Sequence, residues 1–170
     1  MRKTLVNALL LPHINYCAAV YRGIGSGDDL KLQRLVNKEV RYILGLPWDS
    51  PITQARVSLV WLFVSMARAL AVLIIVRMAL IERAPSYLTK RLAVYSASRL
   101  LRNQADSNRL IIPNHRTQAY KFAFAVAAPY LWNGLPEALR SIRNASTFKT
   151  GLTSWLRTTD ESCATKFIST

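Results

Sequence analysis

The sequence has little of what disulfide-stapled or repetitive chains require. Its 170 residues include only two cysteines, Cys17 and Cys163, which lie near opposite ends of the chain. Because two such distant thiols give no disulfide framework, the cysteine usage indicates a reducing compartment, and we expect a cytoplasmic or nuclear protein. Six glycines and seven prolines are ordinary numbers, which excludes collagen-like and low-complexity chains.

Clustered carboxylates are also missing. Asp and Glu together number nine, and their only adjacent pairs are Asp28–Asp29 and Asp160–Glu161. The first pair falls at a predicted helix start, where the helix dipole favours acids, and the second falls in a predicted tail. Since two-metal phosphoryl transfer needs carboxylates gathered at one point, the sequence predicts no such site and no catalytic residue.

Metal and phosphate motifs are equally scarce. His13 and Cys17 are four residues apart and could share a metal on one helical face, but His115 and Cys163 add no finger-like spacing. The glycines of residues 23–27 precede no Lys-Ser or Lys-Thr, so they form no phosphate-binding loop. We therefore expect no metal and no cofactor.

Positive charge is what the sequence has in excess. Lys and Arg number 23 against nine acidic residues, for a formal net charge of +14. Sixteen of the 23 are Arg, whose planar guanidinium suits phosphate contacts better than the ammonium of Lys. An excess of this size exceeds the needs of solubility and indicates a polyanionic partner, with nucleic acid as the first candidate.

Hydrophobic residues make up 51% of the chain, enough for a real core in about one domain. The most apolar stretch, residues 59–81, is long enough to span a bilayer, but Arg68 and Arg77 lie inside it. We interpret residues 58–82 as a long buried helix and expect no membrane insertion. The predicted fold is mainly α, a helical bundle with this long central apolar helix and a small β-hairpin in the C-terminal half.

Residues 27–44 form the clearest predicted helix. Ser26, with Asp29 three residues later, is the expected N-cap, and Gly45 followed by Pro47 is the expected stop. At 100° per residue, apolar side chains gather on one side (Leu32, Leu35, Val36, Val40, Ile43, Leu44) and four cations on the other (Lys31, Arg34, Lys38, Arg41).

This row of four cations spans about 15 Å at 1.5 Å per residue, a length comparable to a few successive phosphates. It is a candidate nucleic-acid-binding surface. A solvated helix face with no ligand is the alternative, and the sequence alone leaves it open.

The second half is more basic still, with twelve basic residues and two acidic ones between residues 83 and 157. Four arginines lie in or beside a polar segment at 96–108 (Arg99, Arg102, Arg109, Arg116), with Tyr95 and Tyr120 available for base stacking. They complete the candidate nucleic-acid-binding set, although arginines that merely cover the rim of an apolar core would give the same pattern. Residues 110–112, and the alternation of large and small residues over 120–126, predict the hairpin.

Several short motifs follow one another along the chain. The first group comprises Leu9-Leu10-Leu11-Pro12-His13-Ile14-Asn15-Tyr16-Cys17 and Leu32-Gln33-Arg34 with Arg41. The second group comprises Trp61-Leu62, Ala84-Pro85-Ser86-Tyr87-Leu88, Ser98-Arg99, Leu101-Arg102, Pro113, Arg116-Thr117, Ala127-Ala128-Pro129, Leu131-Trp132-Asn133, Leu135-Pro136 and Phe148-Lys149. In order and spacing, these motifs resemble the region that follows the palm in non-LTR (LINE-type, jockey-like) retrotransposon reverse transcriptases.

The resemblance implies a thumb-like helical bundle over residues 1–95, an exposed basic loop over 96–108, a C-terminal extension over 109–158 and a tail over 159–170. It implies a palm-less fragment of an RNA-directed DNA polymerase that contacts the backbone of an RNA/DNA duplex and has no catalysis of its own, because the family's paired aspartates have no match here. The missing palm domain is a second implied partner. An inactive relic, or a helical protein-interaction domain, is the alternative.

Overall fold

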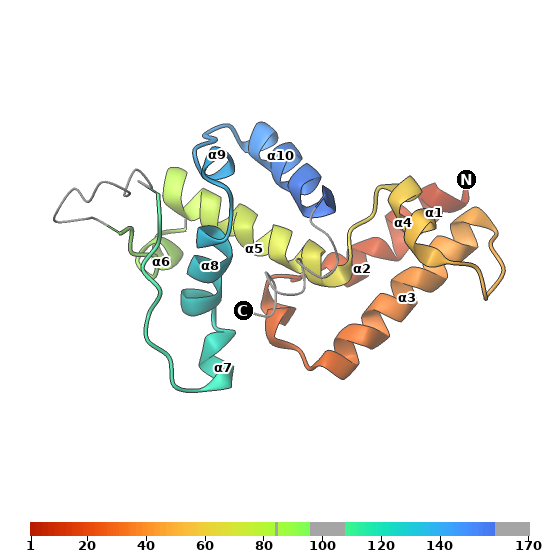
Figure 1. The fold of residues 1–170 in the computed structure, drawn as a ribbon, viewed down its shortest axis with the longest axis horizontal. Helices are drawn as coiled ribbons and strands as arrows, with labels where there is room; N and C mark the ends of the chain where they lie inside the picture. The colour runs from red at the N-terminus through yellow and green to blue at the C-terminus, as the bar shows by residue number, and fades with distance from the viewer. Residues whose placement is uncertain (84, 96–107, 159–170) are drawn as a thin grey trace. The chain divides into compact units, whose positions relative to one another are not determined.

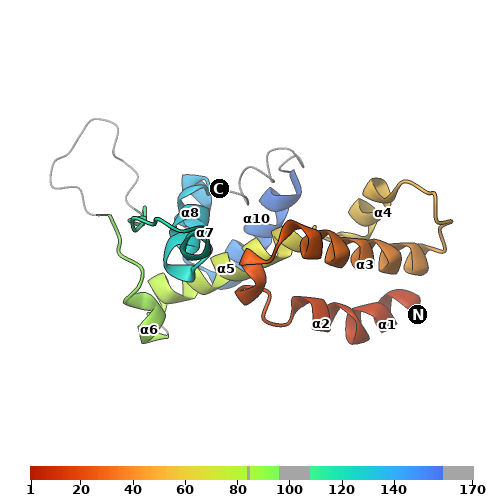
Figure 2. The same ribbon diagram turned by 90° about the horizontal axis from the view of Figure 1, so that it is seen from below.

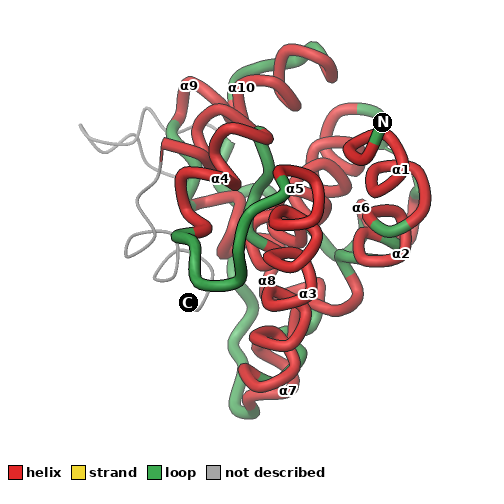
Figure 3. The backbone as a smooth tube through the Cα atoms, turned by 90° about the vertical axis from the view of Figure 1, so that its right-hand side faces the viewer, coloured by secondary structure: helices red, strands yellow, loops and turns green. Residues whose placement is uncertain are grey.

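The computed structural model describes residues 1–83, 85–95 and 108–158, and it is mainly helical (Figure 1). The helices are α1 (Arg2–Leu9), α2 (Leu11–Asn15), the 3-10 turn η1 (Val20–Gly23), α3 (Ser26–Leu44), α4 (Ile52–Leu59), α5 (Val64–Ile81), α6 (Ser86–Thr89), α7 (Gln118–Lys121), α8 (Phe124–Asn133), α9 (Glu137–Arg140) and α10 (Ala145–Thr158). Loops join them, and the tube in Figure 3 contains no strand in the described part of the chain.

The chain divides into two compact units, residues 1–68 and 69–170. The division falls inside α5, just after Arg68, rather than at the predicted basic loop. Of that loop, residues 96–107 lie outside the described residues, as does the predicted tail from residue 159 onward. Each unit is therefore described by itself.

In the first unit, α3 is the longest helix, and α1 and α4 pack against it (Figure 2 shows α1 beside α3). Its buried apolar residues include Val36 and Val40 of α3, with Val6 from α1 and Leu59 from α4. Leu35, expected on the packed side, is 46% exposed instead. Because α1 and α4 are short, they cover only part of the apolar side of α3.

Of the two predicted ends of α3, only the C-terminal one is confirmed. Gly45 adopts a left-handed conformation with φ +66° and stops the helix, as predicted. The predicted N-cap Ser26 is wrong, because Gly25 occupies that position and no side chain caps the helix. Asp28 and Asp29 lie in the first turn, where their negative charge interacts favourably with the positive end of the helix dipole.

The long apolar helix begins later than predicted. Val60 takes a left-handed conformation with φ +67°, which ends α4, and α5 starts at Val64. The predicted helix over 58–82 is thus broken at residues 60–63. By length and composition alone the region could cross a membrane, which is weak evidence because a buried core helix passes the same test.

The two arginines of α5 are both buried and both paired within their own unit. Arg68 is bonded to the carboxylate of Asp29 and donates to the carbonyl of Tyr21 at 3.0 Å. Arg77 donates to Glu82 at 3.2 Å and to the carbonyl of Arg143. Each charge thus has protein partners at a depth where an unpaired charge would be costly.

The core of the second unit is built from α5, α8 and α10. Trp132 of α8 and Phe148 of α10 are fully buried, with ring centroids 6.0 Å apart. The guanidinium of Arg77 lies 5.9 Å from the centroid of the Phe148 ring, which joins α5 to the same cluster. The oxygen Oδ1 of Asn144 accepts bonds from the amides of Ser146 and Thr147 and so caps α10.

The small β-hairpin is not confirmed. Of residues 120–126, expected to form a strand, 120–121 belong to α7, 124–126 belong to α8, and 122–123 form the turn between them. The described residues hold only one isolated antiparallel bridge, between Val94 and Leu110. Thr117 caps α7 by accepting from the amide of Tyr120 at 3.2 Å, and the alanines that alternate with large residues are strong helix formers. The Asn133 side chain bonds both the amide and the carbonyl of Leu110, at 2.8 Å each, where a strand would otherwise pair.

Candidate nucleic-acid interface

The structure places the four predicted cations of α3 (Lys31, Arg34, Lys38 and Arg41), which we name the α3 stripe, along one hollow of the first unit. Lys31, Arg34 and Lys38 are exposed and Arg41 is half-buried. All four line a single open hollow of about 800 Å³ together with Trp48, which is 66% exposed. None of the residues that line it is acidic. The hollow therefore brings four cations together with an aromatic ring, and Leu32, Leu35 and Asn37 complete its lining.

Trp48 is held among the cations. Lys38 Nζ lies 5.7 Å from the centroid of its ring and the guanidinium carbon of Arg41 lies 5.2 Å from it, both within cation–π range. Arg41 also donates to the carbonyl of Ser50 at 3.4 Å, a second link between α3 and the segment that carries the indole. The chain turns back at Gly45, and Pro47 follows, so that residue 48 returns beside the last turns of the helix.

Trp48 was not among the sequence-predicted site residues. A sequence pattern could have revealed it. Trp48 follows the glycine that stops the helix by three residues, and Arg41 and Lys38 lie one and two turns before that glycine.

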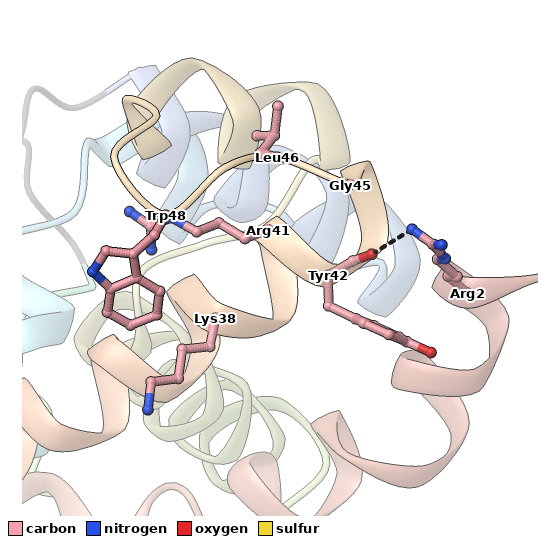
Figure 4. A pocket seen from close by; sticks show the side chains of 7 residues that line it. All are labelled: Arg2, Lys38, Arg41, Tyr42, Gly45, Leu46 and Trp48. Atoms are coloured by element: carbon pink, nitrogen blue, oxygen red, sulfur yellow. Dashed lines mark hydrogen bonds between the residues drawn. The ribbon is translucent and has the colours of Figure 1, made fainter.

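A further cation joins the same end of α3. Arg2 lies with Lys38, Arg41, Tyr42 and Trp48 around a second hollow of about 460 Å³ (Figure 4). Arg2 donates to the carbonyl of Tyr42 at 3.3 Å, and its guanidinium is 5.5 Å from the centroid of the Tyr42 ring. Sequence reasoning missed Arg2 because 40 residues separate it from its partner.

The acids near the α3 stripe leave most of its charge uncompensated. Lys31 pairs with Asp28 at 2.8 Å on the surface; this hydrogen bond and the opposite charge lower the pKa of Asp28 and raise that of Lys31. Glu39 is only 5% exposed, and its burial raises the pKa of its carboxyl group. Neither of its oxygens has a hydrogen-bond partner among the described residues, and Glu39 does not line the hollow.

A second basic group in the first unit lies away from the surface. Arg22 is half-buried, and this burial, followed by repulsion from Arg68, lowers its pKa to about 10. Arg68 is already paired with Asp29. This group belongs to the interior of the unit and adds nothing to the basic surface.

The other predicted binding residues belong to the second unit. Arg109 and Arg116 are both exposed, while Arg99 and Arg102 lie outside the described residues. The amide of Tyr95 donates to the carbonyl of Arg109 at 2.8 Å, so the two residues lie on neighbouring segments of the chain. Tyr95 and Tyr120 are both close to half exposed.

Metal-ligating side chains are dispersed: over residues 1–83, 85–95 and 108–158, no three of His, Cys, Asp or Glu gather around a common point. No family model, curated protein or solved structure matches the chain. The ligands that suit the hollow of the α3 stripe follow from its charges and shape. Four cations in a row of about 15 Å, with an indole at one end, form a surface suited to a flexible or helical polyanion.

Proposed function

We propose that the chain binds nucleic acid through the phosphate backbone, at the hollow formed by the α3 stripe and Trp48. The observation that carries the proposal is the placement of Lys31, Arg34, Lys38 and Arg41 along one hollow that no acidic residue lines. A solvated helix face would have no need of a shared concave surface. The overall charge of +14 supplies the long-range attraction for a polyanion.

Contact with the backbone rather than with bases is the expected mode. The row consists of Lys and Arg at spacings of three, four and three residues, which repeats charge along the helix but offers few side chains that read base edges. Trp48 holds Lys38 and Arg41 by their cationic heads, so its role is to position charge. Binding of this kind is independent of sequence and strongly dependent on salt.

The ligand we propose is an RNA/DNA duplex. The support is the resemblance of the chain's motifs to the region after the palm of non-LTR reverse transcriptases, where a thumb grips primer and template. On this proposal the chain is a palm-less fragment without catalysis of its own, and the palm domain is its other partner.

The test is fluorescence anisotropy of the full chain with a labelled RNA/DNA duplex between about 50 and 200 mM salt. Four phosphate contacts predict a slope of roughly −3.6 in log K against log salt, an affinity loss of about 100-fold over this range. Lys31→Glu with Arg34→Glu should weaken binding to all sequences alike and flatten the slope by about half.

The matched control reverses two charges outside the hollow, Lys3→Glu with Arg91→Glu, both at exposed positions. An equal loss in this control would show that net charge alone drives binding and would refute the site. A loss confined to some duplex sequences would refute the backbone mode.

One observation favours the second candidate, a helical protein-interaction domain. Leu5, Leu9 and Leu10 are 46%, 59% and 43% exposed, all within or just after α1. Exposed apolar residues grouped on one short helix are typical of a surface that packs on a partner. A folded, monomeric chain that binds no duplex at about 50 mM salt would favour this candidate over nucleic-acid binding.

A further inference from the structure

Three arginines of the second unit line one pocket of about 350 Å³: Arg83, Arg140 and Arg143. Asn108 and Ser141 supply further polar groups to its lining. We propose that this pocket binds a small organic phosphate. All of its residues belong to the second unit, so it is independent of the α3 surface.

The three arginines reach the pocket from different places in the chain. Arg83 follows the end of α5, Arg140 is the last residue of α9, and Arg143 lies in the turn before α10. Arg140 is only 6% exposed, so one of the three charges is built into the interior of the unit. Arg77 donates to the backbone carbonyl of Arg143, which ties that turn to α5.

The conformation of Arg83 is a separate observation. Its φ is +53°, in the left-handed region that glycine normally occupies after a helix. A residue other than glycine is disfavoured there, because its Cβ crowds the backbone. An arginine in this position is explained if its guanidinium is needed at the pocket that it lines.

The charge of the pocket is positive throughout. No acidic residue is among those that line it. The nearest acid in sequence, Glu82, directs its carboxylate to Arg77 at 3.2 Å. Three guanidinium groups in the lining of one volume favour an anionic ligand over a neutral or cationic one.

The chemistry of the lining selects the ligand class. Guanidinium groups match the oxygens of phosphate in a bidentate geometry. The walls also include the apolar side chains of Leu80, Ile81 and Val94, which suit a ring or alkyl portion attached to the phosphate. The volume falls at the lower end of the range of small-molecule pockets, which fits a mononucleotide-sized ligand better than a duplex.

The experiment measures thermal unfolding of the full chain with inorganic phosphate, pyrophosphate and AMP, each up to about 10 mM at matched ionic strength. AMP and pyrophosphate should raise the midpoint in a saturable manner, and calorimetric titration should give one site per chain. Arg83→Gly and Arg143→Gln should each weaken binding of the best probe about tenfold or more. Because glycine is preferred at a positive φ, Arg83→Gly removes the guanidinium without endangering the fold.

Arg91→Gln is the matched control, because Arg91 is an exposed arginine of the same unit that does not line the pocket. It should change the affinity by less than about twofold. Lys31→Glu with Arg34→Glu should leave phosphate binding unchanged, which separates this pocket from the proposed nucleic-acid surface.

Three results would overturn the proposal: no probe binds, Arg91→Gln loses as much affinity as the pocket variants, or only a duplex and none of the small phosphates competes for the pocket.

Discussion

The guanidinium carbon of Arg41 lies 5.2 Å from the centroid of the Trp48 ring, and Lys38 Nζ lies 5.7 Å from the same centroid. Two cations of one helix thus share the indole that follows the helix stop. The arrangement limits the freedom of two long side chains before any ligand arrives, and binding therefore orders fewer rotamers.

Replacement of this indole should weaken nucleic-acid binding modestly. We expect Trp48→Ala to lower the affinity for a duplex about two- to fivefold, since an exposed cation–π contact is worth roughly 0.5–1 kcal/mol. The slope of affinity against salt should stay close to that of the wild type, because no cation is removed. Anisotropy titrations of both proteins at three salt concentrations measure both quantities.

Trp48→Phe is the informative companion, since a phenyl ring keeps part of the cation–π attraction and should retain most of the affinity. If Trp48→Ala binds as tightly as the wild type, the indole has no positioning role. If it abolishes binding outright, base stacking on the indole rather than charge positioning dominates.

The pair between Asp28 and Lys31 gives a prediction in the opposite direction. Asp28→Asn removes the acid that occupies Lys31 at 2.8 Å, so the affinity for a duplex should rise, by about two- to fivefold. Lys31 holds the pKa of Asp28 below its usual range. Protonation of Asp28 should therefore leave binding unaffected from about pH 5 to pH 8.

Asp28→Asn combined with Lys31→Gln is the test of this mechanism, because without the lysine the gain from Asp28→Asn should shrink. A gain of the same size in both backgrounds would assign the effect to overall charge.

Glu39 makes stability depend on pH. Its burial raises the pKa of the carboxyl group in the folded state above the unfolded value, so folding is disfavoured where the unfolded chain is ionised. This penalty is absent below the unfolded pKa, grows as pH rises towards the folded pKa, and is complete above it. Glu39→Gln should therefore stabilise the protein at about pH 7, and by progressively less towards about pH 4.

Urea unfolding of wild type and Glu39→Gln across that pH range is the measurement. A constant difference at every pH would mean that the amide acts through packing, and a less stable variant at neutral pH would mean that the carboxylate has a partner worth more than its burial costs.

The sequence predicted the helical class and the basic side of α3 because both follow from local periodicity. The positions of Lys31, Arg34, Lys38 and Arg41 on one side of a helix depend only on 100° per residue. Arg2 and Trp48 escaped prediction because their places depend on how α1 and the segment after Gly45 return to α3, which is tertiary information. Exposed Leu35 escaped for the same reason, since the wheel places it with the apolar set but no neighbouring helix covers it.

The error at residues 120–126 has a different origin. Alternation of large and small residues fits a strand of period two, but the small members are alanines that also favour helix. In the structure α8 buries side chains on most of its sides (Val126, Ala127, Ala128, Pro129, Leu131 and Trp132), so burial does not follow a period of two there. Pattern alone could not choose between two periodicities that the same residues obey.

Two left-handed residues end neighbouring helices, and they should respond oppositely to substitution. Gly45 has φ +66° and Val60 has φ +67°, but only the first is a glycine. A Cβ at position 45 would lie 3.5 Å from Arg2 Nη1, an ordinary contact, so the penalty of Gly45→Ala comes from the backbone alone and should be about 1–2 kcal/mol of destabilisation. Val60→Gly relieves the same strain at a branched residue that is 51% exposed, and should stabilise by up to about 1 kcal/mol. Chemical denaturation of both variants measures these changes, provided that the slope of the free energy of unfolding against denaturant concentration is unchanged. A destabilised Val60→Gly would show that the valine side chain contributes more stability than its left-handed conformation costs.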